Sequence, residues 1–482
     1  MRIRRPCSLI VLASLSLAGC ITVGPDYEPP ATEAPAAWTR LESASVRATD
    51  AGATGDLSQW WQRLEDPLLS ELVAEALRAN PDLRSARARL REARARRGVA
   101  VSGLYPSVGA SATTSRNRSS EQMGGGDTRE FYSAGFDASW ELDVFGGTRR
   151  GVEAADADLE SAAANLEDTQ VTLAAEVATN YVEVRAQQAL IRIALDNLAS
   201  QSETLQITEW RGQAGLASAQ DVAQARTNRE RTRAAIPFLE TSLAAAEHRL
   251  DVLLGLAPGT LHARLGATEH TLQVPDGIAV GIPADTLRQR PDVRAAERKL
   301  AAETARVGVA EAARYPSFSL SGSVGVEALS AGALDNGGAS ASSLFGGITA
   351  PIFEAGRLRS QVEIQDAVRE QAQVSYEQAV LGALQDVEDA LVEVSRNGTR
   401  DEALTSAVES ARIASQLAQE RYGAGLIDFQ SVLETDRTVL AVEESLARNR
   451  ADGVLSLIRL YKALGGGWSA QSASGTSGKD HP

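Results

Sequence analysis

The sequence repeats itself at a single fixed spacing. Four widely separated pairs of segments share this spacing (for the first pair, 315 − 105 = 210): Tyr105-Pro106-Ser107 with Tyr315-Pro316-Ser317, Asn80-Pro81-Asp82 with Arg290-Pro291-Asp292, Arg211 to Val222 with Arg421 to Val432, and Leu254-Gly255 with Leu464-Gly465. Because four separate matches at one spacing are improbable by chance, we interpret the chain as a tandem duplication. The unit that must fold is therefore about half of the 482 residues, and the fold must accommodate two similar halves.

Residues 132–144 alternate without a break between two kinds of side chain. The even positions, from Tyr132 to Val144, are apolar or aromatic, whereas the odd positions are Ser, Gly, Asp or Glu. In the second half, Phe318, Leu320, Val324 and Val326 alternate with serines in the same way, and weaker alternation covers Val108 to Arg118 and Leu344 to Phe353. Since successive side chains of a strand point to opposite faces, each half is predicted to contain a β-hairpin, at about 105–144 and about 315–353.

Two environments fit such hairpins, a soluble core and a membrane. A half-buried soluble sheet alternates in the same way. The strands, however, approach the length of about 9–11 residues that crosses a tilted bilayer, and Asp137, Glu141 and Asp143 on the polar face suit a water-filled lumen. We therefore favour the membrane. Four strands are too few for a barrel, and lipid does not tolerate open sheet edges, so several copies must pool their strands.

After each hairpin the pattern becomes helical over an unusually long stretch. Residues of about 151–206 contain no proline, and Val177, Val184, Ile191, Leu198 and Leu205 recur at intervals of seven, which is typical of a coiled coil. A similar stretch covers about 357–421. Each reaches an Ala-Gly-Leu turn, after which a second helix is expected to return. A solid coiled-coil stalk, as in an adhesin or a spacer, is the structural alternative.

Composition excludes several classes of function. The formal net charge is −15, which argues against a nucleic-acid partner because the phosphate backbone requires Lys and Arg. The four histidines are scattered singly without the spacing of metal ligands. No nucleophile elbow, phosphate loop or convergent His, Cys or carboxylate set is present in the sequence, so we expect neither an enzyme nor a bound cofactor.

The N-terminal segment up to Cys20 has the pattern of a secretion signal. Arg2, Arg4 and Arg5 precede an apolar segment from Leu9 to Leu17, which is too short to span a bilayer. The segment ends in Leu17-Ala18-Gly19-Cys20, which resembles the bacterial lipobox, where the thiol is diacylated and the chain is cut before the cysteine. An ordinary signal peptide with an incidental cysteine is the alternative. A covalent lipid on Cys20 alone would bind a membrane weakly, so a second attachment is expected.

Taken together, these motifs resemble the TolC-like outer-membrane efflux factors, in particular the OprM/NodT-type lipoproteins. The resemblance covers nearly the whole chain and is carried by the lipobox and by these segments in this order: Val23-Gly24-Pro25-Asp26-Tyr27, Trp60-Trp61 with Asp66-Pro67, Asn80-Pro81-Asp82-Leu83, Arg290-Pro291-Asp292-Val293, Tyr315-Pro316, Pro351 to Gly356, Tyr422 to Leu426, and Leu460 to Trp468.

The resemblance implies an α+β membrane protein in the outer membrane. Three protomers, each with four strands, would form one 12-stranded transmembrane β-barrel, continued by a periplasmic α-helical coiled-coil barrel with an equatorial mixed region. It also implies a passive exit duct for drugs or other small molecules. The partners would be a periplasmic adaptor, an inner-membrane RND-type transporter and outer-membrane lipid. Antibiotics, metals, siderophores and signal lipids are all compatible cargoes.

The resulting domain organisation has five parts. They are a lipoprotein signal peptide (1–19), a lipidated extended leader (20–58), repeat 1 (59–270, with its turn at about 211–222), repeat 2 (271–468, with its turn at about 421–432) and a disordered tail (469–482).

The resemblance also assigns roles at the two turns. Gly215 and Leu216 in the first turn, and Gly425 and Leu426 in the second, would face the adaptor. Each glycine permits a tight reversal, which a plain helix–turn–helix would need equally.

The closed end of the duct would lie just beyond the second turn. By position Glu434 and Arg437 match the family's charged constriction, although an ordinary solvated ion pair would have the same spacing. Gln430 replaces an apolar member of that constriction. Tyr422 and Asp221 match a hydrogen bond that holds inner and outer helix pairs closed. Ile427 stands where a second link uses arginine.

Overall fold

The computed structural model describes residues 22–31, 35–39, 46–48, 57–123, 125–126, 128–267, 278–280 and 283–468. The signal peptide, Cys20 and the tail after Trp468 lie outside these residues. The chain divides into two compact units, each assembled from three separated segments: unit 1 from Met1–Ala31, Arg89–Ala163 and Ala295–Glu377, and unit 2 from Thr32–Ala88, Ala164–Arg294 and Gln378–Pro482.

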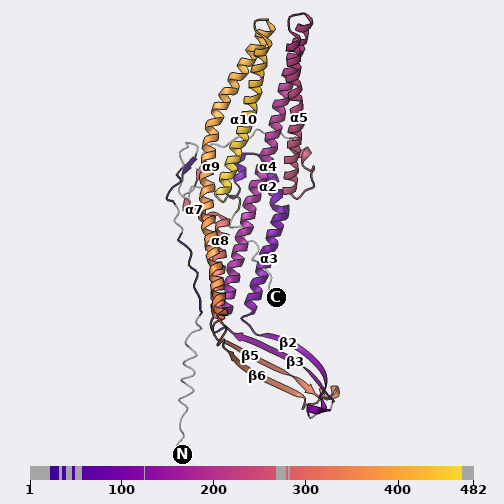
Figure 1. Ribbon diagram of the computed structural model, residues 1–482, viewed down its shortest axis with the longest axis vertical. Helices are drawn as coiled ribbons and strands as arrows, with labels where there is room; N and C mark the ends of the chain where they lie inside the picture. The colour runs from indigo at the N-terminus through magenta and orange to yellow at the C-terminus, as the bar shows by residue number, and fades with distance from the viewer. Residues whose placement is uncertain are drawn as a thin grey trace, which may run out of the picture. The chain divides into compact units, whose positions relative to one another are not determined.

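The elements confirm the tandem duplication to the residue. Four pairs have equal lengths, and their bounds are offset by the repeat spacing (for α4 and α9, 357 − 147 = 210): α3 (Pro81–Ser102) with α8 (Pro291–Ala312), β2 (Ser107–Arg118) with β5 (Ser317–Ala328), α4 (Gly147–Gln213) with α9 (Arg357–Gly423), and α5 (Ala219–Leu253) with α10 (Phe429–Ala463). The labels on the ribbon of Figure 1 show the same order of elements twice: α3, β2, β3, α4 and α5, then α8, β5, β6, α9 and α10.

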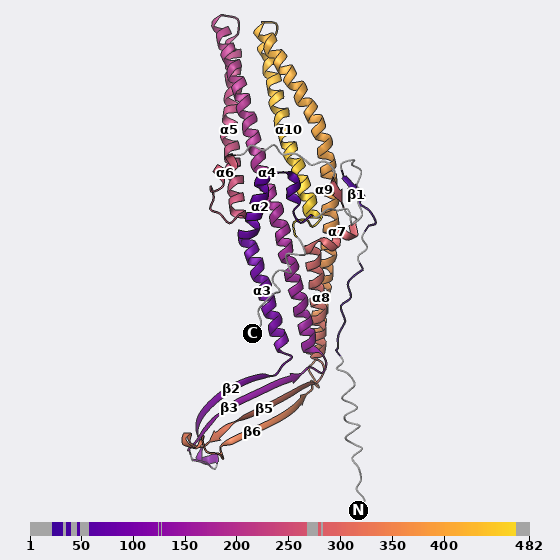
Figure 2. The ribbon, with the colours of Figure 1, turned by 180° about the vertical axis from the view of Figure 1, so that it is seen from behind.

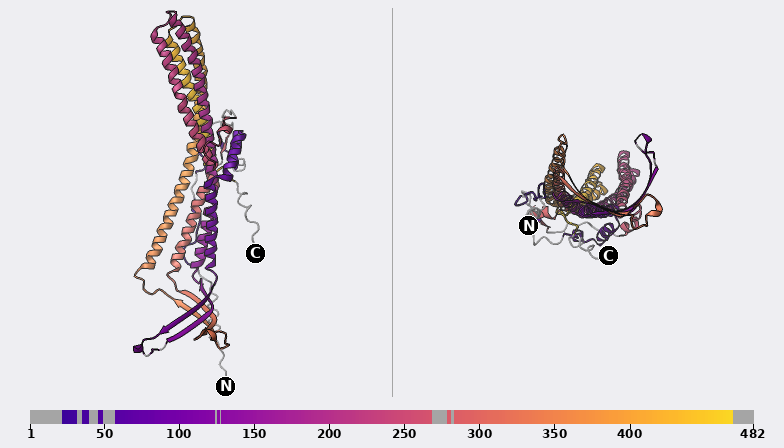
Figure 3. Two further views of the ribbon diagram at one scale, coloured as in Figure 1. Left: turned by 90° about the vertical axis from the view of Figure 1, so that its right-hand side faces the viewer. Right: turned by 90° about the horizontal axis from the view of Figure 1, so that it is seen from below.

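Unit 1 contains one four-stranded antiparallel sheet in the order β2-β3-β5-β6, where β3 is Thr128–Leu142 and β6 is Ser340–Thr349. The hairpin ends carry short 3-10 helices, η2 (Glu121–Met123) and η3 (Ala331–Ala333). Because β3 of the first repeat pairs with β5 of the second, the two hairpins form one continuous sheet, with β2 and β6 as its edges. Seen from below, the sheet is a curved, open arc (Figure 3).

The strand register separates apolar from polar side chains. Phe136 is paired with Val324, and the neighbouring pair is Asp137 with Ser323. On the polar face, the Ser111 hydroxyl donates to Asp137 at 2.8 Å, while the apolar face exposes large side chains on all four strands. This confirms the alternation for residues 132–142, although β3 begins earlier, at Thr128. The last two predicted residues were wrong: β3 ends at Leu142, and the Asp143 carboxylate caps the start of α4, where it accepts from the amides of Thr148 and Arg149 at 3.1 Å and 2.8 Å.

The predicted bounds of the last strand were wrong. We expected Leu344 to Phe353, whereas β6 is Ser340–Thr349. Pro351 has no amide hydrogen to donate to a neighbouring strand, which ends the pairing at this point. The early part of β6 is rich in serine and carries no alternation signal, so its start could not be recognised from the pattern.

The leader segment from Val23 to Asp26 contacts two helices of unit 1, α4 and α8. Arg150 at the start of α4 donates to the carbonyls of Val23 and Gly24 at 3.2 Å each and forms an ion pair with Asp26 at 2.6 Å. A side chain at Gly24, where φ is +90°, would lie 2.3 Å from the Cα atom of Gly308. The leader can therefore approach α8 this closely only with glycine at position 24.

Unit 2 is built around the two helical hairpins α4/α5 and α9/α10, together with α2 (Pro67–Ala79) and the 3-10 helix η1 (Trp60–Leu64). Trp60 is fully buried and stacks on Tyr461 of α10, with 5.3 Å between the ring centroids. Asp66 caps α2 by accepting from the amides of Leu68 and Leu69, and it also accepts from the Tyr181 hydroxyl of α4 at 2.5 Å. The Trp-Trp and Asp-Pro motifs are thus parts of one core.

The two repeats also make one equivalent hydrogen bond with different side chains, asparagine in the first repeat and arginine in the second. Asn80 before α3 donates to the carbonyl of Leu253 at 2.8 Å, and Arg290 before α8 donates to the carbonyl of Ala463 at 3.1 Å. The two donors occupy equivalent positions of the repeats (290 − 80 = 210), and so do the two acceptors (463 − 253 = 210). The side-chain amide of Asn80 and the guanidinium of Arg290 therefore make the same contact in the two repeats.

The remaining elements of unit 2 are short (Figure 2): α6 (His262–Gly266), α7 (Pro283–Gln289), and the strands β1 (Val46–Ala48) and β4 (Ile278–Val280), which pair in parallel and join the leader to the linker between the repeats. None of the described helices combines the length and the hydropathy that a membrane-crossing helix requires.

Candidate gate at the helical turns

The two helical hairpins of unit 2 reverse in turns of the same geometry. Five residues, 214–218 and 424–428, separate the helices of each hairpin. In the first turn the amide of Leu216 donates to the carbonyl of Arg211 at 2.8 Å, and in the second Leu426 donates to Arg421 at 2.9 Å. This six-residue closure is a Schellman motif, which needs a left-handed residue just past the helix.

Gly215 and Gly425 provide that left-handed residue, with φ of +75° and +78°. The leucines that follow them project into solvent: Leu216 is 70% exposed and Leu426 is 73% exposed. Both turns lie at the same end of the helical bundle of unit 2 (Figure 3, left). The four residues expected at the adaptor-facing turns are thus all at exposed turn positions.

Behind the turns, all four helices of the two hairpins share one small apolar cluster. Its buried members are Leu205 of α4, Ala225 of α5, Ala418 and Tyr422 of α9, and Phe429, Val432 and Leu433 of α10. The rings of Tyr422 and Phe429 meet edge to face, with 5.7 Å between their centroids. The cluster packs the two hairpins against one another near their turns.

Helix α10 has one exposed face close to its turn. Gln430, Glu434 and Arg437, at positions i, i+4 and i+7, are all exposed on this face. Among the described residues the Glu434 carboxylate has no ion-pair partner, and Arg437 Nε donates weakly to Asn228 of α5 at 3.4 Å. Glu434 and Arg437 of one chain thus do not form the surface ion pair that was the alternative interpretation.

The hydrogen bond expected between Tyr422 and Asp221 is absent from the described part of the chain, where both residues have other partners. The amide of Ser218 donates to the Asp221 carboxylate at 2.9 Å, and the amide of Asp221 donates to the Ser218 hydroxyl at 3.1 Å. This reciprocal capping box at the start of α5 is a local arrangement that competes with any distant partner. The Tyr422 hydroxyl instead lies 3.4 Å from the hydroxyl of Thr208 on α4.

Sequence reasoning missed the residue that makes the closest contacts between the hairpins. Arg211 of α4 donates from Nη1 to the carbonyl of Tyr422 and, at 3.3 Å, to that of Gly423. Its guanidinium also lies over the Tyr422 ring, 4.5 Å from the centroid. The repeat marked Arg211 in the sequence, because Arg211 and Arg421 open the two matched turn segments. Of these two arginines, it is Arg211 whose side chain reaches the other hairpin.

A buried carboxylate near the same cluster was also missed. Asp436 of α10 is 7% exposed and accepts hydrogen bonds from Ser415 at 2.8 Å and from Gln419 at 3.2 Å, both on α9. Burial raises the pKa of Asp436 above its ordinary value, although the two hydrogen bonds oppose the shift. Its position seven residues after Phe429, on the buried stripe of α10, was the signal in the sequence.

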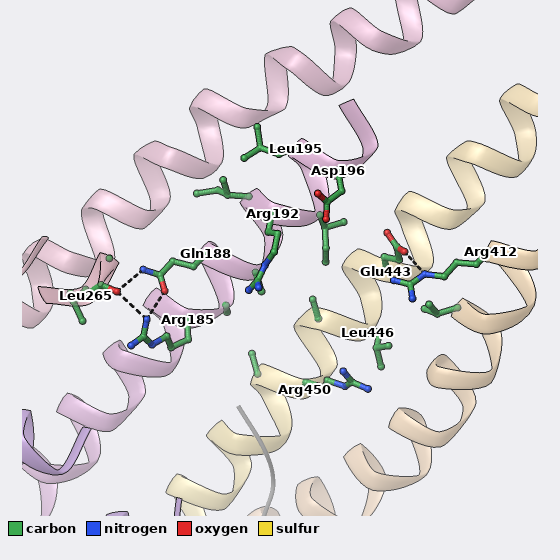
Figure 4. A pocket seen from close by; sticks show the side chains of 18 residues that line it. Arg185, Gln188, Arg192, Leu195, Asp196, Leu265, Arg412, Glu443, Leu446 and Arg450 are labelled. Atoms are coloured by element: carbon green, nitrogen blue, oxygen red, sulfur yellow. Dashed lines mark hydrogen bonds and ion pairs between the residues drawn. The ribbon is translucent and has the colours of Figure 1, made fainter. Parts of the chain in front are cut away.

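A hollow of about 590 Å³ separates the hairpins further from the turns (Figure 4). Part of its polar lining is paired within the lining itself. Arg412 of α9 contacts Glu443 of α10 at 2.7 Å, and Arg185 of α4 donates to Gln188 at 2.8 Å and to the carbonyl of Leu265 at 3.0 Å. In the part of the chain that the structure describes, no three His, Cys, Asp or Glu side chains gather in a way that could hold a metal ion.

The duplicated fold with two helical hairpins and a shared sheet is that of a TolC-like channel. The chain belongs to the outer membrane efflux protein family, whose model matches residues 72–256 and 282–466. The two matches begin at equivalent positions of the two repeats (282 − 72 = 210). The chain is accordingly an outer-membrane component of an efflux system, and its family is one of transport channels.

Individual relatives cover almost the entire chain. Nodulation protein T of Rhizobium leguminosarum bv. viciae is 35% identical over 459 residues, which are 95% of this chain and 92% of the relative. The solved structure of the outer-membrane channel OprN has 36% identity and a TM-score of 0.87, covering 92% of this chain and 99% of that one. The open state of the Neisseria gonorrhoeae MtrE outer membrane channel has 27% identity and a TM-score of 0.81, covering 93% and 98%.

Proposed function

We propose that three copies of this chain form the exit duct of a tripartite, RND-type efflux system. The duct passively conducts small molecules from a periplasmic adaptor and an inner-membrane transporter to the outside of the cell. The observation that carries this proposal is the sheet of unit 1, which has an apolar face exposed to its surroundings and two strands, β2 and β6, at its edges.

The sheet edges argue for the trimer. An open strand edge in lipid leaves backbone amides and carbonyls without partners, each at a cost of several kcal/mol. If β2 of one copy pairs with β6 of the next, three copies close a barrel of 3 × 4 = 12 strands. The apolar face, with Phe136 and Val324, then faces lipid, and the face with Asp137 and Ser323 lines the water-filled lumen.

The lipid on Cys20 supplies the second membrane attachment. One acyl anchor holds a protein reversibly, but an anchor combined with an inserted barrel holds it permanently. The leader that follows Cys20 is fixed to unit 1 through Arg150, Val23 and Gly24, so the anchor and the barrel belong to one attachment.

The exposed face of α10 forms the closed end of the duct. In a trimer, three copies of Glu434 approach one axis, and a ring of carboxylates in a narrow passage repels itself and attracts cations. Arg437, one turn further along the same face, offsets this charge. Gln430 makes the constriction polar where an apolar plug would exclude water, so the gate depends on charge and on helix position.

The two turns face the adaptor. Leu216 and Leu426 are exposed apolar side chains, and the glycines before them let another backbone approach closely. Each turn belongs to a different hairpin. An adaptor that binds both turns can therefore move one hairpin relative to the other.

The test is the behaviour of the detergent-extracted full-length protein. We expect a trimer by light scattering, ion conductance when it is added to a planar lipid bilayer, and co-purification with its native adaptor. A drug-susceptibility panel on a deletion strain would then identify the cargo class. A monomer that remains dispersed without detergent and conducts no ions would disprove the duct.

A further inference from the structure

We infer that Arg211 is the clasp that keeps the gate closed, by tying the end of α4 to the end of α9 within each protomer. The inference rests on the proposed function, because it assigns a residue to the closing of the proposed duct. It assigns this task to the arginine of the first turn segment instead of to Asp221, whose side chain is engaged in capping α5.

Arg211 binds the end of α9 through two kinds of contact, hydrogen bonds to backbone carbonyls and stacking on an aromatic ring. The last carbonyls of a helix have no partner in the helix, and they carry the negative end of its dipole. Arg211 donates to two of these, the carbonyls of Tyr422 and Gly423, and it brings a full positive charge to them. Its flat guanidinium also covers the face of the Tyr422 ring at 4.5 Å.

Burial strengthens the interaction between Arg211 and Tyr422. Tyr422 is 5% exposed, and Nε of Arg211 is shielded from solvent without a hydrogen-bond partner among the described residues. A cation over an aromatic ring is attracted more strongly where water is excluded. The orphaned Nε is the cost of placing the guanidinium flat against the ring, where its other nitrogens reach the carbonyls.

The position of Arg211 makes it sensitive to opening. The capping contacts at Ser218 and Asp428 lie within single hairpins and persist when the hairpins separate. Arg211 belongs to α4/α5, whereas Tyr422 and Gly423 belong to α9/α10. Separation of the hairpins therefore breaks the contacts of Arg211 and leaves the capping contacts in place.

Further polar contacts between the hairpins are long. Gln419 of α9 lies 3.5 Å from Ser200 of α4, and Asn197 of α4 donates to Glu443 of α10 at 3.3 Å. Beyond them the hairpins are parted by the hollow of Figure 4. The apolar cluster around Tyr422 and the clasp thus contribute most of the close contact near the turns.

The repeat provides a matched control. Arg421 occupies the same position in the second turn segment and also lies in the last turn of a long helix, but it is exposed at the surface. Replacing Arg421 removes the same charge at the same distance from a turn. A general effect of net charge would appear in both variants, whereas the clasp predicts an effect of Arg211 only.

The experiment compares single-channel recordings of four full-length trimers in planar bilayers: wild type, Arg211→Ala, Arg211→Lys and Arg421→Ala. For Arg211→Ala we expect the fraction of time in the high-conductance level to rise about tenfold, which corresponds to about 1.4 kcal/mol. Arg211→Lys keeps the charge but loses the flat fork, so a smaller rise is expected. Arg421→Ala should match wild type.

A second measurement follows the turns directly. Cys7 and Cys20 are the only cysteines of the sequence, so spin labels on Gln213→Cys and Ala424→Cys report the separation of the two turns. We expect the distribution of distances to widen toward longer values when Arg211→Ala is added, and to stay unchanged with Arg421→Ala.

Each outcome decides the question. A conducting wild-type trimer whose recordings and label distances are unaffected by Arg211→Ala would overturn the clasp and leave the duct intact. A wild-type protein that forms no conducting trimer would instead remove the duct itself. If Arg211→Ala and Arg211→Lys both fail to form trimers, Arg211 serves assembly, and the clasp is equally wrong.

Discussion

Ser218 and Asp221 hold each other at the start of α5, with amide-to-side-chain distances of 2.9 Å and 3.1 Å in the two directions. The pair satisfies two amides that the helix leaves without partners. A residue placed by family resemblance in an inter-hairpin link therefore has a complete local role, and the two roles lead to different experiments.

If Asp221 acts as a cap, its removal should weaken α5 without opening the duct. We expect Asp221→Ala and Ser218→Ala each to lower the free energy of unfolding of this hairpin by about 1 kcal/mol. Hydrogen exchange at the first turn of α5 should quicken, while the single-channel conductance stays at the wild-type level. A conductance that rises in Asp221→Ala would restore Asp221 to the gate.

Tyr422 should depend on its ring far more than on its hydroxyl. The hydroxyl is 3.4 Å from Thr208, a weak contact, whereas the ring lies in the apolar cluster and under Arg211. We expect Tyr422→Phe to change thermal stability by less than about 1 kcal/mol, and Tyr422→Ala to cost about 3–5 kcal/mol.

Circular dichroism melting of the trimer measures the effect on stability, and bilayer recording measures the effect on the gate. Only Tyr422→Ala should open the channel, because Phe keeps the ring under the guanidinium of Arg211, whereas Ala removes it. Equal conductance changes in the Phe and Ala variants would show that the hydroxyl carries the contact.

The sequence predicted the features that depend on local order. The turns follow from glycine between two helical patterns, and β3 follows from strict alternation. The β6 strand shows the limit: its first residues, from Ser340, are small and polar, so no alternation marks them, and Pro351 ends the strand before Phe353. Periodicity is informative only where large apolar and polar side chains really alternate.

The contacts that hold the candidate gate depend on which helices become neighbours, and this is not a local property. Arg211 and Arg421 have similar surroundings in the sequence, yet it is Arg211 that reaches the end of the other hairpin. Asp436 differs from an exposed acid such as Glu434 by two positions, which is enough to turn its side chain from the outer to the buried face of α10.

The buried Asp436 predicts an unusual dependence of stability on pH. Burial raises the pKa of Asp436, and its partners Ser415 and Gln419 are neutral. Between the unfolded pKa of about 4 and the raised folded pKa, the folded protein binds more protons than the unfolded chain. Stability contributed by this group therefore increases as the pH falls through that window, and it is lost as the pH rises through the folded pKa.

The melting temperature of Asp436→Asn, measured against wild type from pH 7 to pH 4, isolates this contribution. Other carboxyls titrate in both proteins and cancel in the difference. The gain of the Asn variant over wild type should be greatest at neutral pH and should shrink on acidification. A constant difference across the range would show that Asp436 has no raised pKa.

The two faces of the sheet predict opposite responses to a charge at adjacent positions. Val324 lies on the apolar face and is 60% exposed in the single chain, whereas Ser323 lies on the polar face, where its hydroxyl is 2.8 Å from that of Ser343. If the apolar face contacts lipid, Val324→Arg should destabilise the inserted barrel by about 2–4 kcal/mol, the range for arginine near the bilayer midplane. Ser323→Arg adds the same side chain to the water-filled lumen. The yield of heat-resistant trimer in outer-membrane fractions should stay near the wild-type value, and the single-channel conductance should fall because the lumen is narrower. The two variants add the same charged side chain at neighbouring positions of the same strand. A loss of trimer in both variants would show that arginine disturbs strand β5 on either face. A loss of trimer in Ser323→Arg alone would reverse the assignment of the two faces.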